Sequence, residues 1–253
     1  MIYILIQSFN RLEKLKRLLD NPLFIQDARG EGAVVVINAQ GCTDGTNEYV
    51  RTFAQGDIHL KTDVWISWQN PGVVGGRCRL LDYVLARLHR HDILVYLDDD
   101  VEVAARGWLE ALIRPIRDDS KIAITGAFGV LVQPGWSDYV QGVPALPCRV
   151  DVVSQSHTAD AAHLFLDGVE FDLGLGFVWH EDTVLCMEAH ARGYEVFYVG
   201  TPESIGLKHD PHRKDRDAYD GLYWKNWERI KERYAFRGLV MFERALREIE
   251  KHE

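Results

Sequence analysis

The residues best suited to chemistry are three consecutive carboxylates, Asp98, Asp99 and Asp100, which follow the apolar run Ile93 to Leu97. Such a run, rich in β-branched and aromatic residues, predicts a buried central strand. Open α/β sheets form their binding crevice where strands of this kind end. If the extended backbone continues to Asp100, the period of two puts Asp98 and Asp100 on one face of the strand and Asp99 on the other.

Three carboxylates this close repel one another strongly, and a bound divalent cation removes that cost. Asp supplies a hard oxygen ligand that suits Mg²⁺ or Mn²⁺. The competing interpretation is a solvated strand end at which one Asp begins a turn. We expect the metal site, as a hypothesis that the surrounding sequence must support.

A second acidic pair, Glu181-Asp182, follows a glycine-containing stretch and begins a segment that ends at Arg192-Gly193, a typical helix C-terminal signal. Acidic residues at a helix start are also favoured by the helix dipole for purely structural reasons. Beside the three aspartates, however, we expect this pair to act in catalysis.

A third candidate is the glycine-rich loop from Asn70 to Arg77. Gly75 and Gly76 can either allow a tight turn or let a phosphate approach the backbone. Arg77 stands at a helix start, where the dipole disfavours a cation, and this favours a role as an anion ligand.

The elements that position these groups alternate along the first hundred residues. Apolar runs at 2–6 and 33–37 and an alternating pattern at 64–68 predict strands, and helices are expected after each of them. We expect Asn10 to cap the first helix, with Glu13 in the capping-box position. Strand–helix alternation predicts a mostly parallel sheet with helices on both faces.

The second half is less regular. We expect a short helix at 108–113, strands at 121–125, 129–133, 163–166 and 194–199, and a long Gly/Pro-rich loop at 133–147. The last segment, 219–250, is expected to be helical, with Tyr223, Trp224, Trp227 and Tyr234 on an aromatic side that is more often core packing than a sugar platform. Trp136 and Tyr139 in the long loop are the other aromatic candidates for stacking on a sugar.

Composition bounds the function. The 253-residue chain has a net charge of −9, which argues against nonspecific binding to nucleic acid or anionic membranes. No apolar run approaches the roughly 20 residues of a membrane span, and no signal peptide is evident, so we expect a cytoplasmic protein. Peripheral membrane contact and the oligomeric state are left open. The four cysteines form no CxxC pair, so a zinc site is unsupported.

Five ordered motifs together resemble those of the inverting family 2 glycosyltransferases of GT-A fold, from the first strand to about His209. They are Ser8-Phe9-Asn10-Arg11, Cys42-Thr43-Asp44-Gly45-Thr46, Gly75-Gly76-Arg77, Leu97-Asp98-Asp99-Asp100 and Trp179-His180-Glu181-Asp182-Thr183. Each motif is weak alone, and their common order makes the match specific. The resemblance implies one GT-A domain over 1–253, with a nucleotide-binding half (1–103), an acceptor and catalytic half (104–217) and a helical extension (218–253).

The resemblance also implies transfer of a hexose or N-acetylhexosamine from a nucleoside-diphosphate donor to a hydroxyl, with Mn²⁺ or Mg²⁺. Asp98 is then expected near the donor sugar, Asp100 on the metal, and Asp182 as general base beside Glu181. Arg77 resembles the basic residue near the nucleotide, and His209 an extra metal ligand. The remaining expected donor contacts are Ser8, Asn10, Arg11, Asn38, Asp44, Gly75, Gly76 and Asp99.

One position departs from the family. An Asp that recognises the nucleotide base usually follows the second strand, and the register against Asp44-Gly45 puts Ala39 there. Asn38 or Asp44 are the possible substitutes, so the base is left open.

Three alternatives remain at this point. A retaining transferase on the same fold would not use Asp182 as a base. A nucleotidyltransferase would need a glycine-rich basic loop after the first strand, and Ser8-Phe9-Asn10-Arg11 has no glycine. A non-catalytic nucleotide- or sugar-binding module is favoured by Ala39 and disfavoured by the intact Asp98, Asp100 and Asp182.

Overall fold

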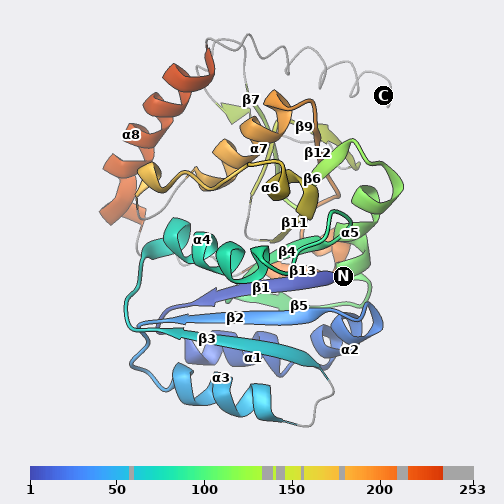
Figure 1. Cartoon of the computed structure of the whole chain (residues 1–253), viewed down its shortest axis with the longest axis vertical. Coiled ribbons are helices and arrows are strands. Elements are labelled where there is room, and N and C mark those ends of the chain that lie inside the picture. The colour runs from blue at the N-terminus through green and yellow to red at the C-terminus, as the bar shows by residue number, and fades with distance from the viewer. Residues whose placement is uncertain are drawn as a thin grey trace.

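A computed structural model of the chain describes residues 1–56, 60–132, 139–140, 146–154, 157–176, 180–209 and 216–235. Its centre is an eight-stranded sheet in the order β3-β2-β1-β4-β11-β6-β12-β9 (Figure 1). The strands are β1 (Ile2–Ser8), β2 (Val34–Gln40), β3 (Lys61–Ser67), β4 (Ile93–Asp98), β6 (Ile122–Gly126), β9 (Cys148–Val150), β11 (His157–Ala161) and β12 (Glu195–Tyr198). Smaller pairings join β5 (Val101–Val103) to β13 (Leu207–His209), and β7 (Gly129–Val132) to β8 (Tyr139–Val140) and β10 (Val152–Val153).

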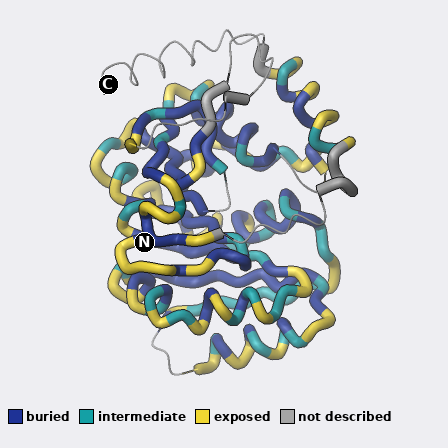
Figure 2. Tube along the Cα trace, turned by 180° about the vertical axis from the view of Figure 1, so that it is seen from behind, coloured by how far each residue is buried: buried dark blue, intermediate teal, exposed yellow. Residues whose placement is uncertain are grey.

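The helices cover both faces of this sheet. They are α1 (Leu12–Leu19), α2 (Pro22–Gly30), α3 (Thr46–Gln55), α4 (Gly72–Leu85), α5 (Trp108–Asp118), α6 (Ala162–Leu166), α7 (Glu181–Ala191) and α8 (Arg216–Ala235), with 3₁₀ turns η2 (Leu173–Leu175) and η3 (Glu203–Ile205). One apolar core packs α1, α2, α3 and α5 on one face, and the other packs α4, α6, α7 and α8 on the opposite face. Figure 2 shows the inner strands buried between helices whose outer sides are exposed, whereas the edge strand β3 is only half-buried or exposed.

The first half confirms the predicted parallel sheet. β3, β2, β1 and β4 are parallel neighbours, so their carboxyl ends reach the same edge. The register places Gln7 of β1 between Asn38 of β2 and Asp98 of β4, all on the face covered by α4. Ser8 and Ala39 lie one residue on and therefore face the opposite core. This edge is the one that carries the predicted motifs.

Two local predictions in this half are wrong. Asn10 does not cap α1, because its backbone is left-handed (φ 52°) and its side chain accepts a hydrogen bond from the Thr43 amide instead. The α1 start is capped by Asp44, whose Oδ2 accepts from the Leu12 amide at 2.9 Å. The glycine-rich stretch is also no loop, since α4 begins at Gly72 and contains Gly75, Gly76 and Arg77. The short helix α2, capped by the Asn21 side chain, was not predicted.

The second half departs further from the prediction. The expected strand at 163–166 is helix α6, and the strand that completes the sheet is β11, just before it. β11 runs antiparallel between β4 and β6, and it joins strands from both halves into one sheet. Most of the 133–147 loop, with Trp136, lies outside the described residues, as do His212 and the side chains of Tyr139 and Tyr234.

Candidate active site

The three aspartates lie at the carboxyl edge of the sheet and take different partners. Asp98 is the last residue of β4, and Asp99 and Asp100 form the turn before β5. The extended backbone therefore stops before Asp100, and the two-residue alternation does not apply beyond Asp98. The side chain of Asp98 is 28% exposed, whereas those of Asp99 and Asp100 are each only 4% exposed.

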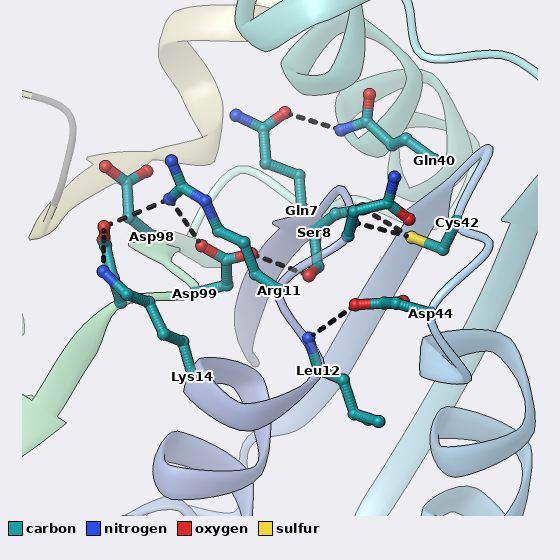
Figure 3. Close-up of polar contacts among 12 residues, drawn as sticks. Gln7, Ser8, Arg11, Leu12, Lys14, Gln40, Cys42, Asp44, Asp98 and Asp99 are labelled. Carbon is teal, nitrogen blue, oxygen red and sulfur yellow. Dashed lines mark hydrogen bonds and ion pairs between the residues drawn. The ribbon is translucent and has the colours of Figure 1, made fainter. Parts of the chain in front are cut away.

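Asp99 is bound by residues at the end of β1 and at the start of α1. Its carboxylate accepts from Ser8 Oγ at 2.7 Å and from Arg11 Nη1 at 3.0 Å (Figure 3). Burial raises the pKa of Asp99 to about 7, although the Arg11 charge and the Ser8 hydrogen bond work to lower it. Ser8, Arg11 and Asp99 were predicted as donor contacts, and the structure brings them together.

Asp100 is paired with two cations from the start of α1. Its Oδ2 lies 3.1 Å from Arg11 Nη1 and 3.5 Å from Lys14 Nζ. Residues three apart on a helix share a face, so both cations point to the same carboxylate. Lys14 was not predicted, and its spacing from Arg11 is the signal that could have found it.

Arg77 connects the aspartates to the second acidic pair. Its Nη2 lies 3.4 Å from Asp98 Oδ1 and 3.8 Å from Glu181 Oε1, and its guanidinium stands 5.7 Å from the centre of the Tyr96 ring. The Arg77 side chain is 4% exposed. A buried guanidinium thus joins carboxylates that are 83 residues apart in the sequence, counting from 98 to 181.

Glu181 and Asp182 differ in environment although they are neighbours. Glu181 is buried, and burial raises its pKa to about 7, against the lowering effect of Arg77. Asp182 is partly exposed at the first turn of α7, where its Oδ1 accepts from the Thr183 amide at 2.7 Å. Its Oδ2 accepts no hydrogen bond from the residues that the structure describes.

His180 precedes this pair in a strained conformation. Its φ of 67° is left-handed, which is uncommon for a residue with a side chain. The ring is buried, lies 4.4 Å from the Tyr223 ring and 5.5 Å from the Trp227 ring of α8, and contacts Thr183 Oγ1 at 3.3 Å. Backbone strain of this kind is maintained only where the surroundings hold it, and here α8 does so.

Several predicted donor contacts have structural tasks. Both oxygens of Asp44 accept hydrogen bonds, from Leu12 and from Thr46. Burial works to raise the pKa of Asp44, but the bonds from Thr46 and Leu12 keep it below its ordinary value. Asn10 and Cys42 pin the loop after β1 to the loop after β2 through hydrogen bonds of 2.8 and 3.4 Å.

The two glycines allow close packing of α4 on the sheet edge. A Cβ on Gly76 would lie 2.1 Å from Gln7 Oε1 and 2.3 Å from Gln40 Nε2, and one on Gly75 would lie 2.7 Å from Pro71. The Gln7 and Gln40 side chains hydrogen-bond to each other at 3.1 Å. This amide pair at the ends of β1 and β2 was not predicted. The signal that could have found it is the position of Gln40 two residues after Asn38, which puts both side chains on the same face of β2.

Of the positions considered for base recognition, Asp44 is exposed, whereas the two in β2 are buried. Asn38 and Ala39 are each 0% exposed, and the Asn38 amide has no partner atom among the described residues. His209 lies in β13, where its backbone pairs with Val101, the residue after Asp100. Its side chain is outside the described part of the structure. Within that part, no group of three His, Cys, Asp or Glu side chains could hold a metal by itself.

The fold is that of known GT-A glycosyltransferases. The chain is similar to a mannosyltransferase, PcManGT, from Pyrobaculum calidifontis, solved in complex with GDP-Man and Mn²⁺ (18% identity, TM-score 0.61, 84% of this chain and 58% of that one). It is also similar to GalNAc-T7 with UDP, GalNAc and Mn²⁺ (15%, TM-score 0.69, 92% and 47%) and to S. aureus TarS (15%, TM-score 0.59, 96% and 41%). The chain spans about half the length of these proteins.

Sequence comparison adds no family. No family model matches the chain, and no curated protein matches it. Among the helices that the structure describes, none combines the length and apolar character needed to cross a membrane. The GT-A fold, with a mostly parallel central sheet flanked by helices, is therefore what the comparisons establish.

Proposed function

We propose that this protein transfers a sugar from a nucleoside-diphosphate donor to a hydroxyl acceptor, with inversion and with Mn²⁺ or Mg²⁺. The observation that carries this proposal is the contact of Arg77 with both Asp98 and Glu181. This contact brings the aspartate edge of the sheet and the start of α7 to one place. A displacement reaction needs such an arrangement, because the residues that bind the donor and the residue that activates the acceptor must lie on either side of the reacting carbon.

The residues present fit a divalent cation. Mg²⁺ in such sites commonly takes one or two carboxylates from the protein and the rest of its ligands from substrate phosphates and water. Asp98 and Asp100 would supply those two carboxylates, so a third protein ligand is not required. The bound cation would stabilise the charge that gathers on the departing diphosphate.

Asp182 is the proposed general base. It is the more exposed of the acidic pair, and only its Oδ1 is used to hold the helix start. The Oδ2 would take the proton from the acceptor hydroxyl as that oxygen attacks the anomeric carbon and the bond to the diphosphate breaks. Glu181 instead faces Arg77 and helps to orient it toward Asp98.

Arg77 is proposed to serve the donor as well. A guanidinium held rigidly in a buried position can offer planar hydrogen bonds to a phosphate or a sugar hydroxyl with little further loss of freedom. Its two carboxylate partners fix that orientation before the donor arrives.

The test separates binding from transfer. A thermal-shift screen of nucleoside diphosphates with and without Mn²⁺ is expected to find one nucleotide that raises the melting temperature only with metal. Asp100→Asn should remove this metal-dependent shift. Asp182→Asn should keep the shift and lose transfer by about 100- to 10,000-fold.

The matched control is Asp118→Asn, which changes an exposed aspartate of α5 outside the site and should alter neither measurement. NMR of the product anomer should show inversion relative to the donor. Normal turnover by Asp182→Asn, or a retained anomer, would contradict the base assignment. No metal-dependent shift with any nucleotide would overturn the proposed function.

A further inference from the structure

We propose that Trp224, supported by Tyr223, is the acceptor subsite and that it binds the apolar face of a neutral pyranoside. The inference rests on the proposed function and names the class of acceptor for it. Its basis is a continuous series of aromatic contacts that leads from the exposed indole of Trp224 to the residue preceding Glu181-Asp182.

Trp224 is exposed beside the buried side of α8. Trp227 and Ile230 are 3% and 1% exposed, whereas Trp224 is 60% exposed. An α-helix turns by about 100° per residue, which places Trp224 about 60° from Trp227 around the axis and about 100° from Tyr223. Trp224 therefore stands at the rim of the interface between α8 and the rest of the protein, with one part supported and another open to solvent.

The supporting contacts are ring to ring. The Trp224 ring meets the Tyr223 ring edge to face, with centroids 5.2 Å apart and an interplanar angle of 84°. Tyr223 in turn lies 4.4 Å from His180. His180 is the N-cap residue of α7, two positions before Asp182. Two successive ring contacts thus connect Trp224 to His180, the residue that directly precedes the acidic pair proposed to act on the acceptor.

The helix that carries Trp224 is fixed against the α7 region. Asn226 Nδ2 donates to the Leu175 carbonyl at 3.0 Å, and Arg229 Nη1 donates to the Gly174 carbonyl at 2.7 Å. Arg233 pairs with Asp172 at 3.0 Å and with Glu188 of α7 at 2.9 Å. An aromatic surface held this firmly loses little freedom when a ligand binds to it.

The chemistry of the site favours a neutral sugar ring. The negative face of an aromatic ring attracts the positively polarised C–H groups that a pyranose presents on its apolar side. Glu181, Asp182 and the net charge of −9 disfavour an anionic acceptor. A β-gluco-configured pyranoside offers three axial C–H groups on one face and equatorial hydroxyls around its rim. Stacking on the indole would leave these rim hydroxyls unburied and therefore available to a base.

The experiment measures sugar binding without turnover. Saturation-transfer NMR on the full chain with methyl β-D-glucopyranoside and cellobiose should show the strongest transfer to the axial hydrogens H1, H3 and H5. Trp224→Ala should weaken the apparent affinity about tenfold, and Trp224→Phe should restore most of it. Trp68→Ala is the matched control, because Trp68 is 95% exposed at the end of β3 and lies outside the aromatic series.

Equal signals from Trp224→Ala and the unchanged protein would overturn the proposal, as would glycerol competing as well as the pyranoside. Once a donor is known, Trp224→Ala should raise the acceptor KM about tenfold with little change in kcat. The proposed function fails separately, since a missing metal-dependent nucleotide shift leaves pyranoside binding measurable. Exposure of Trp224 makes loss of folding unexpected, and circular dichroism of the variant checks it.

Discussion

The two acidic clusters of the site, the aspartates after β4 and the pair at the start of α7, are compensated by different cations. Asp99 and Asp100 are neutralised by Arg11 and Lys14 from the adjoining helix α1. Within the part of the chain that the structure describes, Arg77 is the one cation that pairs with Glu181, and burial raises the pKa of Glu181 to about 7. The aspartate cluster therefore carries its own counterions, whereas the α7 pair depends on an arginine that belongs to the other half of the chain.

The two clusters should therefore respond differently when a cation is removed. If a divalent ion binds this cluster as proposed, it can replace Arg11 and Lys14 as the partner of the carboxylates, because its charge is greater. Arg77 has no such substitute, since it must hold Asp98 and Glu181 together. The consequences of removing each cation should therefore differ in kind as well as in size.

Arg77→Met should have the largest effect, because it leaves two carboxylates without their shared cation. Breaking a buried ion pair typically costs about 3–5 kcal/mol. We expect about 2–3 kcal/mol of unfolding free energy, since Asp98 is partly exposed and Glu181 can take up a proton. Urea denaturation measures this. Arg79→Met, two residues along α4, is the control and should cost under about 1 kcal/mol of unfolding free energy. Equal losses from both variants would show that the ion pairs of Arg77 with Asp98 and Glu181 do not stabilise the fold.

Glu181→Gln should change how stability depends on pH. Burial raises the folded-state pKa of Glu181 from 4.5 to about 7, so the native protein holds a proton that the unfolded chain has released. The unchanged protein therefore loses stability as pH rises from about 4.5 to about 7, and the Gln variant escapes this loss. The stability of the variant relative to wild type should rise across that window in denaturation series at several pH values. A difference that stays constant with pH would contradict the raised pKa.

Lys14→Met should have the smallest effect, and in the favourable direction. Its ammonium lies 3.5 Å from Asp100 and would compete with a metal for that carboxylate if Asp100 is a ligand, as proposed. Removing it should tighten Mn²⁺ binding about threefold, or ~0.7 kcal/mol, as followed by electron paramagnetic resonance. Lys16→Met removes a charge from the same helix, but one that pairs with Glu13, and should leave the affinity unchanged. Weaker Mn²⁺ binding by Lys14→Met would mean that the lysine helps to shape the site.

Much of the first half was predictable because β1, β2 and β4 contain unbroken apolar runs and β3 has an alternating pattern, each followed by polar turn residues. The residues at the ends of β1 and β4, including Ser8 and Asp99, could be placed together because parallel strands end at one edge. The role of Asn10 in linking the loop after β1 to the loop after β2 could not be predicted. The residue that caps α1 in its place, Asp44, lies 34 residues later in the sequence.

The second half was harder for a physical reason. β11 is His157-Thr158-Ala159-Asp160-Ala161, which is fully buried yet has no apolar run to reveal it. The helical conformation of Gly75 and Gly76 was not predicted because glycine usually favours turns. The close approach of Pro71 accounts for Gly75, and that of Gln7 and Gln40 accounts for Gly76. The contact of Arg77 with Glu181 depends on tertiary structure that no local pattern encodes. Expectations for Trp136, His209 and His212 rest on side chains outside the described residues and stay predictions.

The antiparallel insertion of β11 also limits how this protein can be divided. β4 is hydrogen-bonded to β1 on one side and to β11 on the other. A fragment cut after Val103 would retain β1 to β5, but it would expose the edge of β4 that pairs with β11, with its backbone amides and carbonyls unsatisfied. Unpaired strand edges of this kind pair with other chains and cause aggregation. Attempts to transplant residues 1–103 as a portable nucleotide-binding module should include a replacement for β11.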